Sequence, residues 1–334
     1  RPIPERKADD AREALIGKFP GIATESSETI LSALLAGVER LGCKVDPSIL
    51  AGIFQKEKNP ASVRIQALRS IASLEKAAGV EMIRKALSSK EASIRALACT
   101  LAAENPQQDS IEKLVQLARN DADISVKKAA LKSLYNCNGS NVDKLFEDLA
   151  SAMRGGTFPK ELSLELLEGL KASKNPAVQA LSSALESNRN AALLAGGNVE
   201  RGSRIFHDRA DVSCLRCHAL NGAGGTVGPD LAGIGSRQTR EYLLEAVEFP
   251  NKAIAKGFEQ VVIAKKDGTG VAGLVKKETD ETLTIESPED GLIEVKTAEI
   301  KSRQRTLSAM PEGLGGMLTP FELRDLIEYL ASLK

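Results

Sequence analysis

The residues of this chain that could do chemistry gather in one short run. Of its five cysteines, Cys214 and Cys217 enclose two residues and are followed directly by His218, in the pentapeptide Cys-Leu-Arg-Cys-His. Two thiols on one helical turn can reach the two vinyl groups of a porphyrin, and the next side chain presents an imidazole to the iron. The spacing is the signature of covalent c-type haem attachment. It predicts one covalent haem c with its iron.

Two other interpretations of the same residues have to be weighed. A zinc site could be built from Cys214, Cys217, His218 and His207, but tetrahedral zinc sites usually combine one closely spaced couple with a distant one. A thioredoxin-type redox pair would need a strand before the motif and a βαβ context, whereas this motif is followed by a loop over residues 221–228. Haem attachment is therefore the leading interpretation.

The other three cysteines are expected to be structural. Cys43, Cys99 and Cys137 stand alone in segments with a helical pattern, and an odd total argues against a framework of disulfides. Free cysteine packs like a small apolar residue, so we expect all three to be buried. Residues 1–197 also contain no histidine, and they show no motif of catalysis.

Two predicted helices enclose the haem motif in the sequence. Asn198 is a suitable N-cap for the first helix. The second begins with a capping box from Thr319 to Glu322, which has Pro320 at the first helical position. Its apolar side chains recur at intervals of three and four, as in an amphipathic helix. Between the helices, the segment 222–235 is rich in glycine, which allows backbone to lie against a flat ligand.

Several residues in this order resemble the class I cytochrome c fold. They are Gly202 and Phe206, the Cys214–His218 motif, the run Gly228-Pro229-Asp230-Leu231, Met310-Pro311, and Leu326 to Leu330 with Tyr329. The resemblance implies that the Pro229 carbonyl faces the proximal His218 and that Met310 supplies the distal sulfur to the iron. Met310 is preferred to Met317, which lies beyond Gly315-Gly316, and Met82 and Met153 are assigned to the core of the N-terminal part.

A narrower resemblance is carried by two loops. Pro250-Asn251-Lys252-Ala253-Ile254 with Gly257-Phe258, and the run from Ser308 to Leu314, are similar to the haem-binding domain that ends large exported proteins of planctomycetes and verrucomicrobia. The resemblance covers residues 198–334. It implies that a sugar or alcohol dehydrogenase often lies upstream in the same protein. Because the sequence begins at Arg1 without an initiator Met or an export signal, a mature chain or a fragment is expected.

His218 and Met310 are too far apart in the sequence for a compact cytochrome with short loops, so an insertion is expected between them. Residues 258–264 and 270–275 alternate around Lys266-Asp267-Gly268, and residues 282–286 and 292–295 do so around 288–291, which are two hairpin signals. Residues 299–303 could add a fifth strand. We predict a small antiparallel sheet or barrel over about 258–305, which shields or braces the haem edge.

The N-terminal part carries an internal repeat. Each copy begins with a β-branched apolar residue followed by a basic one, and a small-apolar pair comes three residues later. The three copies begin at Val63, Ile94 and Val126, and their pairs are Ala67-Leu68, Ala98-Cys99 and Ala130-Leu131. The period of about 32 residues is typical of stacked helix pairs. Weaker copies at Ile30 and Leu162 extend the array. The pattern resembles HEAT-type repeats, in which each motif lies on the second helix of a pair.

The fold class is therefore mainly α, with a solenoid of HEAT-like helix pairs over residues 1–186, a linker over 187–197 and a cytochrome c-like domain over 198–334. Basic and acidic residues number 45 each, and aromatic residues make up 3%. Neither a basic field nor stacking platforms for nucleic acid are present. No apolar run reaches the length of a membrane span, so no transmembrane segment is expected in this chain.

The leading functional hypothesis is electron transfer without catalysis by the chain itself. Met/His ligation leaves no open position on the iron and raises its potential. The expected partners are a fused or docked dehydrogenase as donor and a cytochrome or oxidase as acceptor, with the chain in the periplasm or otherwise outside the cytoplasm. The alternatives are a haem sensor or haem enzyme whose sixth position is open or taken by His207, and an interaction scaffold built on the repeats.

Overall fold

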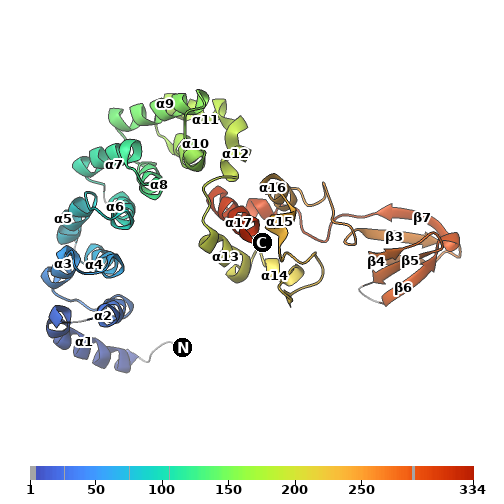
Figure 1. The fold of residues 1–334 in the computed structure, drawn as a ribbon, viewed down its shortest axis with the longest axis horizontal. Coiled ribbons are helices and arrows are strands. Elements are labelled where there is room, and N and C mark those ends of the chain that lie inside the picture. The colour runs from blue at the N-terminus through green and yellow to red at the C-terminus, as the bar shows by residue number, and fades with distance from the viewer. Residues whose placement is uncertain (1–4, 26, 75, 105, 288–289) are drawn as a thin grey trace. The chain divides into compact units, whose positions relative to one another are not determined.

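The structure is a computed structural model that describes residues 5–25, 27–74, 76–104, 106–287 and 290–334. The chain divides into two compact units, Arg1–Ser187 and Asn188–Lys334. The first contains helices, and the second contains helices and β-strands (Figure 1). No helix among the described residues is long and apolar enough to cross a membrane.

The first unit is a row of helix pairs. Its elements are α1 (Glu5–Glu25), α2 (Glu28–Leu41), α3 (Pro47–Gln55), α4 (Ala61–Leu74), α5 (Lys76–Ala86), α6 (Ala92–Glu104), α7 (Gln108–Asn120), α8 (Ile124–Ser133), α9 (Ser140–Arg154), the 3₁₀ turn η1 (Lys160–Leu162), α10 (Ser163–Ala172), α11 (Pro176–Ala184) and the turn η2 (Glu186–Asn188). Figure 1 shows the pairs along a curved row, with α2, α4, α6, α8 and α10 on its concave side. Helices α2, α4, α6 and α8 each pack on the next even-numbered helix of the row, and all five helices also pack on their own partners.

The repeat motif occupies equivalent places in three of these helices. Val63 in α4, Ile94 in α6 and Val126 in α8 are fully buried. The small-apolar pairs that follow them are fully buried too, and Cys99 takes the place that leucine has in the other two repeats. The predicted HEAT-like solenoid is confirmed by this arrangement and by the comparison described below.

Three details of the solenoid differ from the predictions. Ile30 is 50% exposed, because the buried stripe of α2 runs through the neighbouring Leu31 instead. Cys137 is half-buried, at the polar corner after α8, whereas Cys43 and Cys99 are buried. Met153, expected in the core, is also half-buried.

Two basic residues of the repeat motif form ion pairs between repeats. The Arg64 guanidinium is buried and donates to Glu91 at 2.8 Å, and Arg95 makes two bonds to Asp121, at 2.7 and 2.8 Å. Each pair joins a helix on the concave side to the corner before the next such helix. These charges therefore fasten consecutive repeats to one another.

The second unit combines short helices with a sheet. Its helical elements are α12 (Arg189–Leu193), α13 (Val199–Asp208), α14 (Cys214–Cys217), α15 (Ile234–Arg237), α16 (Arg240–Glu248), the turns η3 (Thr297–Glu299) and η4 (Leu314–Met317), and α17 (Pro320–Ser332). Its strands are β1 (Ala219–Leu220), β2 (Ala223–Gly224), β3 (Gln260–Lys265), β4 (Gly270–Glu278), β5 (Thr282–Ser287), β6 (Gly291–Lys296) and β7 (Ile300–Arg305). The stretch predicted as a linker therefore contains α12, with Ala192 and Leu193 buried and packed toward α17.

Helices α13 and α17 cross, and they make the most extensive helix contact among the described residues of the second unit. A Cβ on Gly202 would lie 2.0 Å from the carbonyl oxygen of Asp325, so only glycine permits this approach. The buried Asp325 carboxylate accepts hydrogen bonds from Asn198 N at 2.7 Å and Arg201 Nε at 2.5 Å. The predicted caps are present: Asn198 accepts from Arg201 N, and Thr319 forms a capping box with Glu322. Together these contacts join the two ends of the unit.

The predicted insertion is an antiparallel sheet. Among the described residues it has five strands in the order β6-β5-β4-β3-β7, so the last strand returns to pair with β3. Its core consists of Val261, Ile263, Val275, Leu283, Ile285 and Val295. Of the turn predicted at 288–291, Pro288 and Glu289 lie outside the described residues. The sheet thus has its own small core beside the helical part.

Candidate functional site

Two adjoining cavities of about 520 and 260 Å³ lie within the described part of the second unit. The residues that line both are Cys217, His218, Val227, Ala246, Ala309 and Met310. The larger cavity extends to Cys214, to Phe206 of α13 and to Leu326 and Leu330 of α17. Most of the lining is apolar, as in sites that hold an organic cofactor.

His218 is fixed by the loop that follows it. The chain turns back over α14, so that Gly225 N donates to Leu215 O at 2.9 Å and Gly228 N to Cys217 O at 2.7 Å. The His218 ring is bonded through Nδ1 to the Pro229 carbonyl at 2.8 Å. Because a carbonyl can only accept, Nδ1 carries a proton, and in the neutral ring the lone pair is therefore on Nε2. The resemblance implied contact between these two residues, and their role toward a haem stays a prediction.

Gly228 packs directly on the imidazole. A Cβ at this position would lie 2.6 Å from Cε1 and 2.8 Å from Nδ1 of His218. The glycine thus allows the backbone to brace one face of the ring, and the nearby Pro229 carbonyl sets its rotation. Because Nδ1 is occupied by the Pro229 carbonyl, the ring can bind a ligand only through Nε2.

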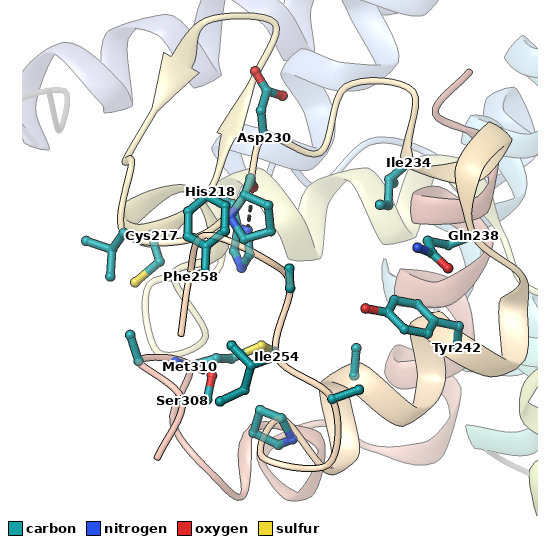
Figure 2. Close-up of a pocket in the computed structure, with 18 of the residues that line it drawn as sticks. Cys217, His218, Asp230, Ile234, Gln238, Tyr242, Ile254, Phe258, Ser308 and Met310 are labelled. Carbon is teal, nitrogen blue, oxygen red and sulfur yellow. Dashed lines mark hydrogen bonds between the residues drawn. The ribbon is translucent and has the colours of Figure 1, made fainter. Parts of the chain in front are cut away.

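Met310 lies on the opposite side of the cavity from His218 (Figure 2). It comes from the segment between β7 and η4, and both cavities include it in their walls. Met317 is 47% exposed, and His207 points away to hydrogen-bond the Tyr329 hydroxyl at 2.9 Å. Neither belongs to the described residues that line the cavities. The structure thus brings Cys214, Cys217, His218 and Met310 to one space, and leaves Met317 and His207 out of it.

Polar side chains gather at the end of the smaller cavity. Figure 2 shows the Tyr242 hydroxyl pointing into the cavity, with Gln238 on the same side. That hydroxyl makes no hydrogen bond to any described residue. Arg237 also lines this end, and its guanidinium donates to the carbonyls of Ala232 and Asp230. The arrangement suits a flat apolar ligand that carries acceptor groups at one edge.

The two alternative interpretations of the cysteine motif gain no support. Within the described residues, no group of three or more His, Cys, Asp and Glu side chains is arranged to hold a metal ion, so the four side chains considered for zinc do not converge. Burial raises the pKa of the Cys214 thiol to about 11. A redox-active thiol needs a lowered pKa, so this environment is unlike that of a thioredoxin-type pair.

Sequence reasoning missed much of the cavity wall. Tyr242 of α16 and Gln238, which follows α15, line the smaller cavity but belong to a stretch in which no sequence motif indicated site residues. Phe258 and Ile254 belong to a loop that was recognised only through its resemblance. The signal that could have revealed α16 is its N-cap, Thr239, which accepts from Tyr242 N.

Comparison with known families agrees with this division of the chain. Residues 49–135 match the family model described as HEAT repeats, and residues 199–280 match that described as cytochrome c. No curated protein matches the chain significantly. The chain thus carries HEAT repeats followed by a cytochrome c domain, which is a haem-binding electron-carrier module.

Proposed function

We propose that the second unit carries one haem c, bonded covalently to Cys214 and Cys217, with His218 and Met310 as its axial ligands, and that it transfers single electrons. The proposal is supported above all by one observation: His218 and Met310 lie on opposite sides of the apolar space that their own side chains help to enclose, beside both cysteines. A planar macrocycle that fills this space would be held from both faces.

The residues of the site have distinct tasks in this proposal. When bound, haem iron alternates between the ferrous and ferric states, and Met/His ligation favours electron transfer over oxygen binding. Pro229 holds His218 in the tautomer and ring orientation that can bind a metal through Nε2. Phe206, Leu326 and Leu330 exclude water from the larger cavity. At the polar end of the smaller cavity, the Tyr242 hydroxyl could donate a hydrogen bond to a carboxylate of the bound haem.

The proposed electron donor is a fused or docked dehydrogenase, and the proposed acceptor is a cytochrome or an oxidase. The solenoid would serve as the docking surface, because stacked repeats supply extended surfaces for protein partners. Since haem is attached to such motifs outside the cytoplasm, the protein is proposed to act in the periplasm or another extracytoplasmic space.

Replacement of Met310 by alanine tests the proposal. The holoprotein, made together with a haem-attachment system, should lose the sulfur-to-iron charge-transfer band of the oxidised state, and its reduced state should bind carbon monoxide. Met317→Ala is the matched control and should change neither property, because Met317 does not line the cavity. If Met317→Ala alone abolished the band, the distal assignment would be wrong.

A further inference from the structure

One side chain ties down both flanks of the segment that carries Met310. The Oδ1 atom of Asn251 accepts a hydrogen bond from Ser308 N at 2.6 Å, and its Nδ2 donates to the carboxylate of Glu312. Ser308 and Glu312 stand two residues before and two residues after Met310. A single amide therefore spans a short arc, residues 308–312, whose centre is Met310.

The arc has little else to hold it in place. The preceding Leu307 is 68% exposed, and Pro311, Glu312 and Gly313 are exposed as well. Inside the arc, Met310 N donates to Ser308 Oγ at 3.1 Å. Because apolar packing fixes only part of this segment, hydrogen bonds have to determine its path.

Asn251 is itself well anchored. It follows Pro250, which is buried, just beyond the end of α16. The next residue closes a turn, with Lys252 N donating to Phe249 O at 3.0 Å. Asn251 thus connects the arc to a helix whose Ala246 forms part of the shared cavity wall.

The residues that precede the arc, Arg305 and Thr306, are paired with the start of strand β3. Thr306 N donates to Gln260 O at 3.0 Å, and Arg305 forms an ion pair with Glu259 at 2.7 Å. The chain that enters the sheet, residues 249–259, and the chain that leaves it, residues 306–313, are therefore paired with each other next to the sheet and again at Asn251. Met310 lies just beyond the second of these ties.

We propose that Asn251 is a positioning residue, which holds the Met310 sulfur toward His218 by bridging Ser308 and Glu312. The inference rests on the proposed ligation by Met310 and adds to it the residue that sets the position of that ligand. Without the bridge, the arc would be attached at Thr306 and then run freely to η4, so the sulfur would spend more time away from the cavity.

The chemistry of the bridge allows a test by exchange of partners. Asn251→Asp keeps an acceptor for Ser308 N but places a second carboxylate against Glu312, and like charges at contact repel. In the double variant Asn251→Asp with Glu312→Gln, the new amide can donate to the new carboxylate, so the bridge is restored with the roles reversed. Glu312→Gln alone keeps a carbonyl oxygen that can accept from Asn251.

The experiment uses the full chain with haem attached. For each variant, the charge-transfer band of the oxidised state and the carbon monoxide affinity of the reduced state are measured. Asn251→Asp should weaken the band and increase the carbon monoxide affinity roughly tenfold, the equilibrium change that loss of a hydrogen bond to a charged group produces. The double variant and Glu312→Gln should stay close to the original protein. Gln304→Glu, an amide-to-acid change on the exposed strand β7, is the matched control and should change neither property.

Two results would overturn the inference: an Asn251→Asp protein with an unchanged band and affinity, or a double variant as impaired as the single one. If Asn251→Asp does not yield folded protein, Glu312→Ala removes one tie at an exposed position, and an unchanged band in that variant would also contradict the bridge. Failure of the proposed function looks different, since the unaltered protein would then lack the band, or Met310→Ala would leave it intact.

Discussion

The two units of this chain are built from contacts of opposite kinds. In the solenoid, each helix packs on its neighbours in sequence, and the ion pairs Arg64–Glu91 and Arg95–Asp121 join consecutive repeats. In the second unit, the decisive contacts join its two ends, where Gly202 lies against Asp325. The first arrangement distributes stability along the row, as in other repeat proteins, whereas the second concentrates it at one crossing.

The difference matters for function because the crossing and the site share residues. Phe206 of α13 and Leu326 and Leu330 of α17 pack within the unit and also line the larger cavity. A change at the crossing should therefore disturb the site, whereas a change in one repeat should be felt by adjacent repeats only.

Removal of both thiols should abolish the covalent cofactor. In Cys214→Ala/Cys217→Ala, no thioether can form, so mass spectrometry of protein made with a haem-attachment system should show the unmodified chain. The matched variant Cys43→Ala/Cys99→Ala should carry one haem as before, because both thiols are buried in the core of the solenoid. Haem retained through acid extraction of the first variant would contradict the proposal.

Gly202→Ala should destabilise the second unit by about 3 kcal/mol or more, since the new Cβ forces apart two packed backbones. Its counterpart in the solenoid is Gly52→Ala in α3, where nothing lies within 4 Å of the new Cβ and the gain in helix propensity is about 1 kcal/mol. Denaturant unfolding measures both changes in stability, with haem absorbance monitoring the second unit and far-ultraviolet circular dichroism monitoring the helices. Equal and small effects at the two glycines would remove the contrast between the units.

The same contrast explains how much the sequence could predict. Periodic and local signals identified the repeat helices, the caps at Asn198 and Thr319 and the strands of the insertion, because neighbouring residues determine these features. The motif at Cys214 revealed the site because its chemistry is contained in five residues. Contacts between distant segments leave no such pattern, so the pairing of β7 with β3 and the packing of residues 189–193 on α17 were not foreseen.

The same limit applies to single side chains. Nothing in the local sequence distinguishes Asn251 from a turn residue or Tyr242 from an ordinary helical tyrosine, and their positions depend on how segments far apart in the chain meet. The ion pair between Arg95 and the buried Asp121 carboxylate was not foreseen for the same reason. Alternating charges at a repeat corner become an ion pair only when the next repeat is stacked.

Asp121→Asn should weaken the solenoid by about 2 kcal/mol near neutral pH, the value typical of hydrogen bonds to charged groups. The Asp121 side chain is 5% exposed, and the hydrogen bond from Arg95 lowers the pKa of its carboxyl. A lowered folded-state pKa stabilises the fold above the ordinary aspartate pKa of about 3.9. That stabilisation is lost as the pH falls through the lowered value, so the difference between variant and original protein should shrink below about pH 4.

Unfolding midpoints at several pH values measure this difference. Asp148→Asn serves as the control, because its pair with Arg119 is much more exposed and exposed pairs contribute little. A difference for Asp121→Asn that persisted unchanged into strong acid would show that lost packing, rather than lost charge, is responsible.

Removal of the whole solenoid is expected to have the smallest effect on the site. Every residue that lines the two cavities lies between Phe206 and Leu330, so a chain beginning at Asn188 should keep the haem spectrum and nearly the same midpoint potential. It should lose affinity for the electron donor, which would appear as slower reduction at low donor concentration.

A chain beginning at Asn198 is the informative comparison, because it also lacks α12, whose Leu193 is fully buried and whose Arg189 pairs with Glu248 at 3.2 Å. That shorter chain should unfold at lower denaturant concentration, although its ligands are the same. A large shift of potential in the chain beginning at Asn188, or unchanged kinetics with the donor, would mean that the repeats act on the haem itself or have no part in docking.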